Sequence, residues 1–219
     1  MKLTAVILTR GLSPPQKTLK SVSFADETLI ISDKLHPLNS DFAAQRNYAL
    51  NKAKGDWVLF VDDDEIVSPQ LAKEINKALT TNKSYLFKRY DSYYNHLLTH
   101  GESGHNRILR LAQKNSGVFI RPVHEVWHVT GPVSTLSNPL LHVHDNLTTD
   151  FIDKIVYYGP IDASCKSYKN RYLLLPIVKF IVNYFFRLGF VDGALGLFHA
   201  YLMSIQSLSV RIFQWQKSS

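Results

Sequence analysis

The chain has 219 residues, 45% of them apolar and 20% charged, a composition that indicates a folded globular protein and excludes a disordered one. The single cysteine, Cys165, excludes an internal disulfide and a cysteine-based metal site, so we expect a reducing compartment. A net charge of +7 suits nucleic acid, an anionic membrane surface or a phosphorylated substrate, and the distribution of the charge must decide among them.

The first half of the chain predicts alternating strands and helices. The opening residues contain too short an apolar run for a signal peptide and are expected to form the first strand. Asp41 and Ser68 are expected to cap helices, and Gly55 is expected to end the first of them. The expected strands are 3–8, 28–31, 58–61 and 84–89, and the expected helices are 42–54 and 69–79. This order predicts an α/β fold with a Rossmann-like, mostly parallel sheet.

One strand ends in an unusual concentration of charge. Residues 57–61 are apolar without alternation, which is typical of a strand buried on both faces, and Asp62, Asp63, Asp64 and Glu65 follow directly. Ligands bind at the ends of such strands in open α/β sheets. Because neighbouring carboxylates repel one another unless a cation joins them, we expect a hard divalent ion, Mg2+ or Mn2+, at this strand end.

The second half changes character near residue 149. Residues 91–150 are rich in His, Asn, Gly and Tyr and are expected to form loops and edge strands around a site. From residue 150 onward the pattern is helical, with helices expected at 151–168, 172–190 and 194–215. We therefore predict a catalytic domain at 1–149 and a helical extension at 150–219.

The helical extension is both basic and apolar, which indicates a membrane surface before nucleic acid. Lys179, Asn183 and Arg187 recur every four residues and form one polar stripe, as in a helix that lies in the plane of a membrane. A membrane-spanning helix is a weaker alternative, because Pro176 and the charges interrupt the apolar run. Packing of these helices on the sheet stays open.

Several motifs in fixed order resemble family 2 glycosyltransferases, most closely the lipopolysaccharide core biosynthesis branch. They are Asp41-Phe-Ala-Ala-Gln-Arg-Asn-Tyr-Ala-Leu50, Ala53-Lys-Gly-Asp-Trp-Val-Leu-Phe-Val-Asp-Asp-Asp-Glu-Ile-Val-Ser68, Arg121-Pro-Val-His-Glu125, Gly131-Pro-Val133, Pro139-Leu-Leu-His142 and Gly189-Phe-Val-Asp-Gly193. The resemblance implies a GT-A fold, a nucleotide-sugar donor, a divalent metal ion and inversion at the anomeric carbon.

The resemblance also assigns roles at the donor site. Asp62 and Asp64 would form the D-x-D pair that holds the metal, with Asp62 also directed toward the nucleotide ribose. Arg46 would be a donor-site cation, and Arg110 matches the family's Leu-Arg-Leu motif. Asp33 would contact the nucleotide base.

Inverting transfer needs one general base to accept the proton of the acceptor hydroxyl. Glu125 is the first candidate and His124 the second, since a carboxylate near a metal and phosphate stays ionised, while a histidine can equally bind either of them. His142 and His144 lie two residues apart on an expected strand, where they would hold one metal or simply pack in an edge strand.

The first donor-binding segment departs from the family pattern. After the second strand the chain reads Ile31-Ser-Asp-Lys-Leu-His-Pro-Leu-Asn-Ser-Asp41 and enters the next helix directly, so about one helix and one strand are missing. The leading hypothesis is a cytoplasmic enzyme at the inner face of the cell membrane, with a lipid-linked or lipopolysaccharide-type acceptor and no nucleic-acid partner. The alternative is a catalytically degenerate family member that serves as a binding or scaffold protein.

Overall fold

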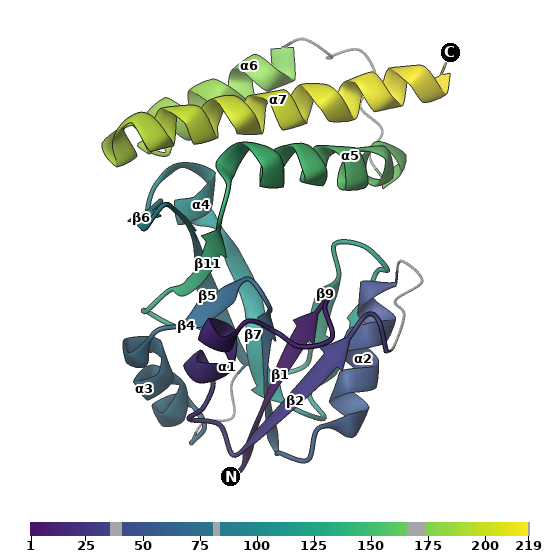
Figure 1. Cartoon of the computed structure of the whole chain (residues 1–219), viewed down its shortest axis with the longest axis vertical. Helices are drawn as coiled ribbons and strands as arrows, with labels where there is room; N and C mark the ends of the chain where they lie inside the picture. The colour runs from purple at the N-terminus through teal and green to yellow at the C-terminus, as the bar shows by residue number, and fades with distance from the viewer. Residues whose placement is uncertain (36–40, 81–83, 166–173, 219) are drawn as a thin grey trace. The chain divides into compact units, whose positions relative to one another are not determined.

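This computed structural model describes residues 1–35, 41–80, 84–165 and 174–218. The chain forms two compact units, which we call the N-terminal unit (Met1–Arg89 with Arg107–Val143) and the C-terminal unit (Tyr90–Asn106 with His144–Ser219) (Figure 1). Residues 90–106 thus belong by compactness with the C-terminal helices, although the sequence analysis assigned them to the catalytic domain. Compactness does not delimit a function, so the division after residue 149 stays a prediction.

The N-terminal unit begins with a parallel three-stranded core. Strand β1 (Leu3–Thr9) lies between β2 (Glu27–Ser32) and β3 (Trp57–Asp62), with a short helix α1 (Gln16–Ser21) after β1. Val6 of β1 is in register with Leu29 and Phe60. All seven residues of β1 are buried, as expected for a strand covered on both faces.

Beyond β3 the sheet is mixed, which corrects the expectation of a mostly parallel sheet. The strand order is β2-β1-β3-β7-β5-β11-β4, and β7 pairs antiparallel with both β3 and β5. Antiparallel neighbours need no crossover helix, so β7 enters the sheet without one. The added strands are β4 (Glu65–Val67), β5 (Ser84–Tyr93), β7 (Arg107–Gln113), β10 (Val133–Thr135) and β11 (Leu140–His144), and β8 (Gly117–Ile120) pairs with β9 (Val126–Val129) in a separate hairpin.

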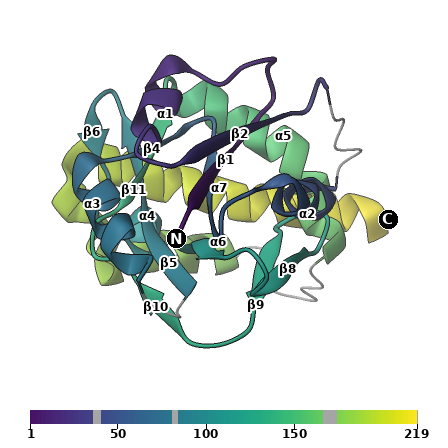
Figure 2. The same ribbon diagram turned by 90° about the horizontal axis from the view of Figure 1, so that it is seen from below.

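The two faces of the sheet bury different helices, because side chains alternate along a strand. One face carries Ile7 and Leu59 against α3 (Pro69–Ala78), whereas the other carries Val58 and Phe60 against α2 (Phe42–Lys52). Figure 2 shows α3 and α2 on opposite sides of β1. The Phe119 and Trp127 rings of the β8-β9 hairpin complete the second cluster by packing on Phe60, with centroids 4.9 and 5.3 Å away.

The predicted helix caps are confirmed at the N-terminal ends. Asp41 accepts a hydrogen bond from Ala44 N at 2.8 Å, and Ser68 accepts one from Leu71 N at 3.2 Å. The predicted end of α2 is wrong by two residues, since the helix stops at Lys52. Gly55 has another purpose: a Cβ there would lie 2.7 Å from Lys2 O and Thr4 N, so the glycine permits the close approach of the chain to β1.

The C-terminal unit is mainly helical. Its elements are β6 (His96–Leu97), α4 (Gly101–His105), α5 (Leu147–Cys165), α6 (Leu174–Ile181), a π-helical turn (Val182–Phe186), a 3-10 turn (Gly189–Asp192) and α7 (Gly193–Ser218). Within this unit α7 lies between α5 and α6 and contacts both. The predicted helix 172–190 is interrupted, because Leu188 adopts a left-handed conformation (φ 58°) after the π turn. Residues 166–168 and 172–173 of the predicted helices lie outside the described residues.

Across the described residues, length and hydropathy give no single helix that qualifies as a membrane span. By the same two measures Leu174–Phe186 and Gly189–Lys217 qualify together, but their axes are bent by 72°.

Candidate active site

The candidate site lies in the N-terminal unit at the carboxyl end of β3. Asp62 continues the alternation of Val58 and Phe60, so its side chain is on the face of the sheet that α2 covers. There Arg46 of α2, only 3% exposed, donates from Nη2 to Asp62 Oδ1 at 2.9 Å. The Arg46 guanidinium also stacks over Phe60 and Phe119, 5.5 and 5.6 Å from the ring centroids, which fixes its orientation.

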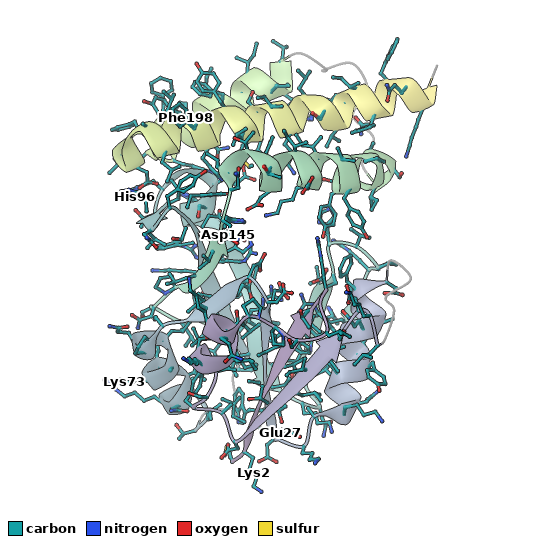
Figure 3. All side chains as sticks on the ribbon, viewed as in Figure 1. Lys2, Glu27, Lys73, His96, Asp145 and Phe198 are labelled. Atoms are coloured by element: carbon teal, nitrogen blue, oxygen red, sulfur yellow. The ribbon has the colours of Figure 1, made fainter. Side chains whose placement is uncertain are left out.

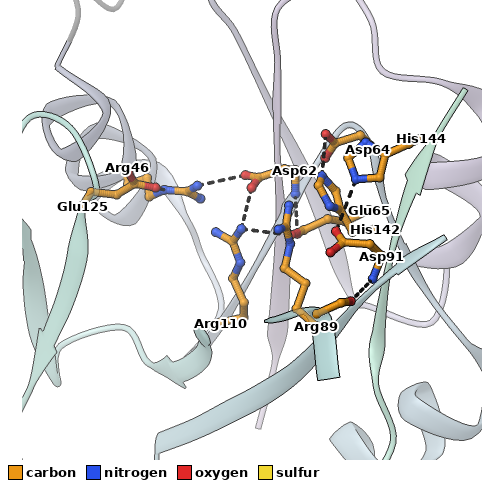
Figure 4. A network of polar contacts seen from close by, with 11 residues as sticks. Arg46, Asp62, Asp64, Glu65, Arg89, Asp91, Arg110, Glu125, His142 and His144 are labelled. Carbon is orange, nitrogen blue, oxygen red and sulfur yellow. Dashed lines mark hydrogen bonds and ion pairs between the residues drawn. The ribbon is translucent and has the colours of Figure 1, made fainter. Parts of the chain in front are cut away.

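A second arginine binds the other oxygen of the same carboxylate. Arg110 of β7 donates from Nη2 to Asp62 Oδ2 and, at 3.0 Å, to Glu65 Oε1. Glu65 is completely buried and also accepts from Arg89 Nε at 2.6 Å and from Asp62 N at 3.0 Å. Figure 4 shows this connected set of carboxylates and guanidinium groups. Each buried charge is therefore paired, which offsets its desolvation.

The charges of this network determine its protonation. Burial opposes ionisation of Asp62, but the positive charges of Arg110, Arg46 and Arg89 outweigh burial and hold the pKa of the carboxyl well below its usual value. Burial acts against the charge of Arg110 too, yet Asp62 and Glu65 raise the pKa of its guanidinium. Asp62 and Arg110 therefore remain charged throughout the physiological pH range.

Asp64, two residues after Asp62, is more open to solvent. Its side chain is 44% exposed, and Oδ2 lies 3.0 Å from Nε2 of the buried His142. Burial raises the pKa of Asp64, but the hydrogen bond and charge of His142 lower it to about 2. An ionised, accessible carboxylate beside an imidazole fits a divalent cation, because carboxylate and imidazole are ordinary ligands of Mn2+ and carboxylate is an ordinary ligand of Mg2+. Asp62, by contrast, has both oxygens engaged by arginines.

Asp63 points away from this site, as predicted from its position between Asp62 and Asp64. Its Oδ2 accepts from Thr9 Oγ1 at 2.7 Å and from Arg10 N at 3.2 Å, and its carbonyl oxygen accepts from Thr18 Oγ1 at 2.8 Å. Asp63 thus holds in place the loop that follows β1 and the helix α1 that leads toward β2.

The three residues Gln45, Arg46 and Asn47 of α2 each make a different contact. Gln45 Nε2 donates to Asp33 Oδ1 at 2.5 Å, so the predicted base-contacting acid lies beside α2. Asn47 exchanges two hydrogen bonds with the backbone of Phe119, at 2.9 and 2.8 Å. This motif therefore connects α2 with the segment after β2, with the end of β3 and with β8.

The structure brings one of the two candidate bases to the arginine network. Glu125 Oε1 accepts from Arg46 Nε at 2.8 Å, and its side chain is 19% exposed. His124 precedes it in a left-handed conformation (φ 54°) and is exposed. The Arg46 fork thus joins Asp62 and Glu125, which are far apart in sequence. The catalytic assignments of Glu125 and His124 stay predictions.

Two buried arginine donors in this region have no hydrogen-bond partner among the described residues. These donors are Arg46 Nη1 and Arg110 Nε. Since an unsatisfied buried donor is costly, these atoms fit a site that a phosphate oxygen or an ordered water completes.

Sequence reasoning left three members of the site without their partners. Glu65 was only the last of four acids, Arg89 belonged to an expected strand, and His142 was paired with His144. The available signal was strand alternation, which puts Glu65 on the same face as the buried Val67 and Arg89 on the same face as the buried Phe87. His142 Nε2 lies 3.0 Å from Asp64 Oδ2, and His144 Nε2 lies 3.2 Å from Asp91 Oδ1 within the C-terminal unit.

Beyond β2, the described part of the chain adds no strand at that edge of the sheet, in line with the shortened donor segment. Residues 36–40 of that segment are outside the described residues.

The sequence matches the family described as glycosyl transferase family 2 over residues 18–127, which include Arg46, Asp62, Asp64, Arg110 and Glu125. Among solved structures, that of S. aureus TarS 1–349 in complex with UDP is 11% identical, with a TM-score of 0.46, covering 100% of this chain and 92% of that chain. The complex of the same protein with UDP-GlcNAc is 13% identical, with a TM-score of 0.46, covering 97% and 84% respectively.

Proposed function

This chain belongs to glycosyl transferase family 2, and we propose that it transfers a sugar from a nucleotide-sugar donor to an acceptor hydroxyl with inversion at the anomeric carbon. One observation supports the proposal above the others. Asp62 is held between Arg46 and Arg110 at the end of β3, directly beside the accessible carboxylate of Asp64. This arrangement offers cations and a metal ligand to a diphosphate.

The donor diphosphate would bind against the arginines of this network. Arg46 Nη1 and Arg110 Nε supply the donors that the chain itself leaves unused within the described residues. Asp64, with Asp62 as the predicted second ligand, would hold Mg2+ or Mn2+. The ion, when bound, would offset the diphosphate charge and stabilise the departing nucleoside diphosphate.

Glu125 is proposed as the general base. As the acceptor oxygen forms its bond to the anomeric carbon, the bond from that carbon to the diphosphate breaks and the acceptor proton passes to the carboxylate. The hydrogen bond from Arg46 Nε holds Oε1 of Glu125, so the other oxygen would accept the proton.

The acceptor is proposed to be lipid-linked or of the lipopolysaccharide type, as in the core-biosynthesis branch that the motifs resemble. The support comes from the C-terminal unit, where large apolar side chains are exposed on α6, the π turn and α7. Phe186 is 78% exposed and Phe198 54%, and Phe198 projects from the surface of α7 (Figure 3). Such a surface suits association with the inner face of the cell membrane.

The decisive experiment is a donor screen on the purified protein, by thermal shift and by donor hydrolysis, with and without Mn2+. A bound donor should raise the melting temperature through mass action. Asp64→Asn should abolish the Mn2+-dependent part of donor binding and hydrolysis. The control is Asp56→Asn, which replaces an exposed carboxylate at the opposite end of β3 and should retain the Mn2+ dependence. If no donor binds in either condition, the alternative of a degenerate binding or scaffold protein replaces the enzyme.

Glu125→Gln tests the base. We expect transfer to an acceptor to fall by about 10²–10⁴ while donor binding persists, since only proton acceptance is lost. Glu74→Gln on α3, whose carboxylate binds the backbone of Ser137 and Asn138, is the matched control. Undiminished transfer by Glu125→Gln would assign the base to another group, with His124 the next to test.

A further inference from the structure

The loop that carries Glu125 contains two residues in the left-handed backbone conformation. Residues 121–125 connect β8 to β9, and among them Arg121 has φ 71° and His124 has φ 54°. Residues other than glycine rarely adopt this conformation, because their Cβ crowds the following carbonyl oxygen, although histidine adopts it more readily than most. Such conformations persist where the surrounding contacts require them, and they are concentrated at functional sites.

Helix α2 holds this loop at both of its ends. Asn47 binds the backbone at the end of β8 through two hydrogen bonds. The N–H of Phe42 has no acceptor within the helix because it lies in the first turn, and it donates to Pro122 O at 2.8 Å. Arg46, one turn after Phe42, donates from Nε to Glu125 Oε1 at 2.8 Å (Figure 4). One helix therefore fixes the loop on either side of the residue that precedes Glu125.

The conformation of His124 determines the direction in which the Glu125 side chain leaves the loop. Between the two contacts with α2, at Pro122 and at Glu125, the chain has two residues in which to turn. Because φ is ordinarily negative, an ordinary conformation at His124 would rotate Glu125 by about 100° or more around the N–Cα bond of His124. That rotation would direct the Glu125 carboxylate away from Arg46 Nε, with which it now forms a hydrogen bond.

We propose that His124 is a positioning residue, whose left-handed backbone serves the transfer reaction by directing Glu125 toward Arg46. The loop then needs no rearrangement when the acceptor hydroxyl arrives, which preserves the alignment on which proton transfer depends. The role assigned to His124 rests on the proposed function of Glu125 as the base. It replaces the alternative in which the imidazole of His124 accepts the proton itself.

The test is a series of substitutions at position 124 in the full chain, with kcat and the donor KM measured in transfer assays. His124→Val introduces a β-branched residue that strongly disfavours positive φ. It should lower kcat by about 100-fold, the effect of misplacing a catalytic group by about 1 Å, and leave the donor KM unchanged. His124→Gly and His124→Asn remove the imidazole but accept positive φ, so each should rescue most of kcat.

Two further variants complete the series. His128→Val makes the same side-chain change at an exposed, extended position of β9 and should keep the wild-type kcat. His124→Ala differs from His124→Gly by one methyl group and should give a kcat between those of the glycine and valine variants. If His124→Val does not fold, the comparison of alanine with glycine decides, and equal kcat values in these two would overturn the proposal.

A double substitution distinguishes positioning from general damage to the fold. In the Glu125→Gln background, His124→Val should cause no further loss of kcat, because groups that act as one unit have non-additive effects. A further loss of about 100-fold would mean that His124 contributes independently of Glu125, and it would overturn the positioning role.

Equal losses of kcat in His124→Gly and His124→Val would assign the imidazole itself to the reaction and overturn the proposal. Wild-type kcat in every variant of the series would overturn it as well. In both cases the proposed base stands if Glu125→Gln lowers transfer. Absence of transfer by the wild type would overturn the proposed function and the role of His124 together.

Discussion

Arg46 and Asp62 form a hydrogen bond of 2.9 Å because α2 covers the face of β3 on which Asp62 lies. The same guanidinium holds Glu125 through Nε at 2.8 Å. One buried side chain therefore sets the distance between the strand end that would bind the donor and the carboxylate that would serve as base. A guanidinium can do this because its donors form a rigid fork.

Arg46→Lys should lower donor turnover by about 100-fold. An ammonium keeps the charge but cannot hold Asp62 and Glu125 at once, and misplacing a catalytic group by about 1 Å has an effect of that size. Steady-state kinetics measure it. Lys52→Arg on the exposed end of the same helix is the control and should leave turnover unchanged. Unchanged turnover in Arg46→Lys would exclude the orienting role.

Glu65→Ala should lower the free energy of unfolding by about 3–5 kcal/mol, because Arg89 and Arg110 would each lose a buried carboxylate partner. Urea denaturation of the purified variant measures the change. The exposed Asp153→Ala on α5 should change it by no more than about 0.5 kcal/mol. Equal effects of the two substitutions would contradict the account of the charge network.

Asn47→Ala should destabilise the protein by about 1–3 kcal/mol, since the N–H and C=O of Phe119 would both lose their partner. The control is Asn51→Ala, one turn further along α2. It removes an exposed side-chain amide of the same kind but leaves the hydrogen bonds of the Phe119 backbone intact. Hydrogen exchange at the Phe119 amide should speed up in the first variant only. Retained protection there would show that another group satisfies this backbone.

The stability of the C-terminal unit should depend on pH through His199. Burial lowers the pKa of this imidazole below its ordinary 6.5. The nearby carboxylates of Asp91 and Glu102 raise the pKa, whereas the positive charges of Lys179 and Lys154 lower it further. As pH falls below 6.5, His199 becomes protonated in the unfolded chain but stays neutral in the folded protein. The stabilisation present above pH 6.5 is therefore progressively lost.

His199→Phe should therefore show a shallower loss of unfolding free energy between neutral and mildly acidic pH than the wild type. The exposed His96→Phe is the control and should follow the wild-type curve. Urea titrations at several pH values measure the difference. Parallel curves for wild type and His199→Phe would mean that this histidine is protonated equally in both states.

Local chemistry made much of the N-terminal unit predictable. Five apolar residues before Asp62 define a buried strand, Asp41 and Ser68 define helix starts, and alternation puts Asp63 on the side away from Asp62 and Asp64. The order of these motifs was sufficient to indicate the family, which the match over residues 18–127 confirms. Each of these signals depends on neighbours within a few residues.

Only the tertiary structure decided which charges meet. Arg89 and Arg110 come from β5 and β7, whose antiparallel placement no local pattern indicated, and His142 reaches Asp64 from β11. The stripe of Lys179, Asn183 and Arg187 was visible in the sequence, but its direction depended on the partner helix and on Glu102. Periodicity determines that a helix has two faces, while packing against distant residues determines which face is buried.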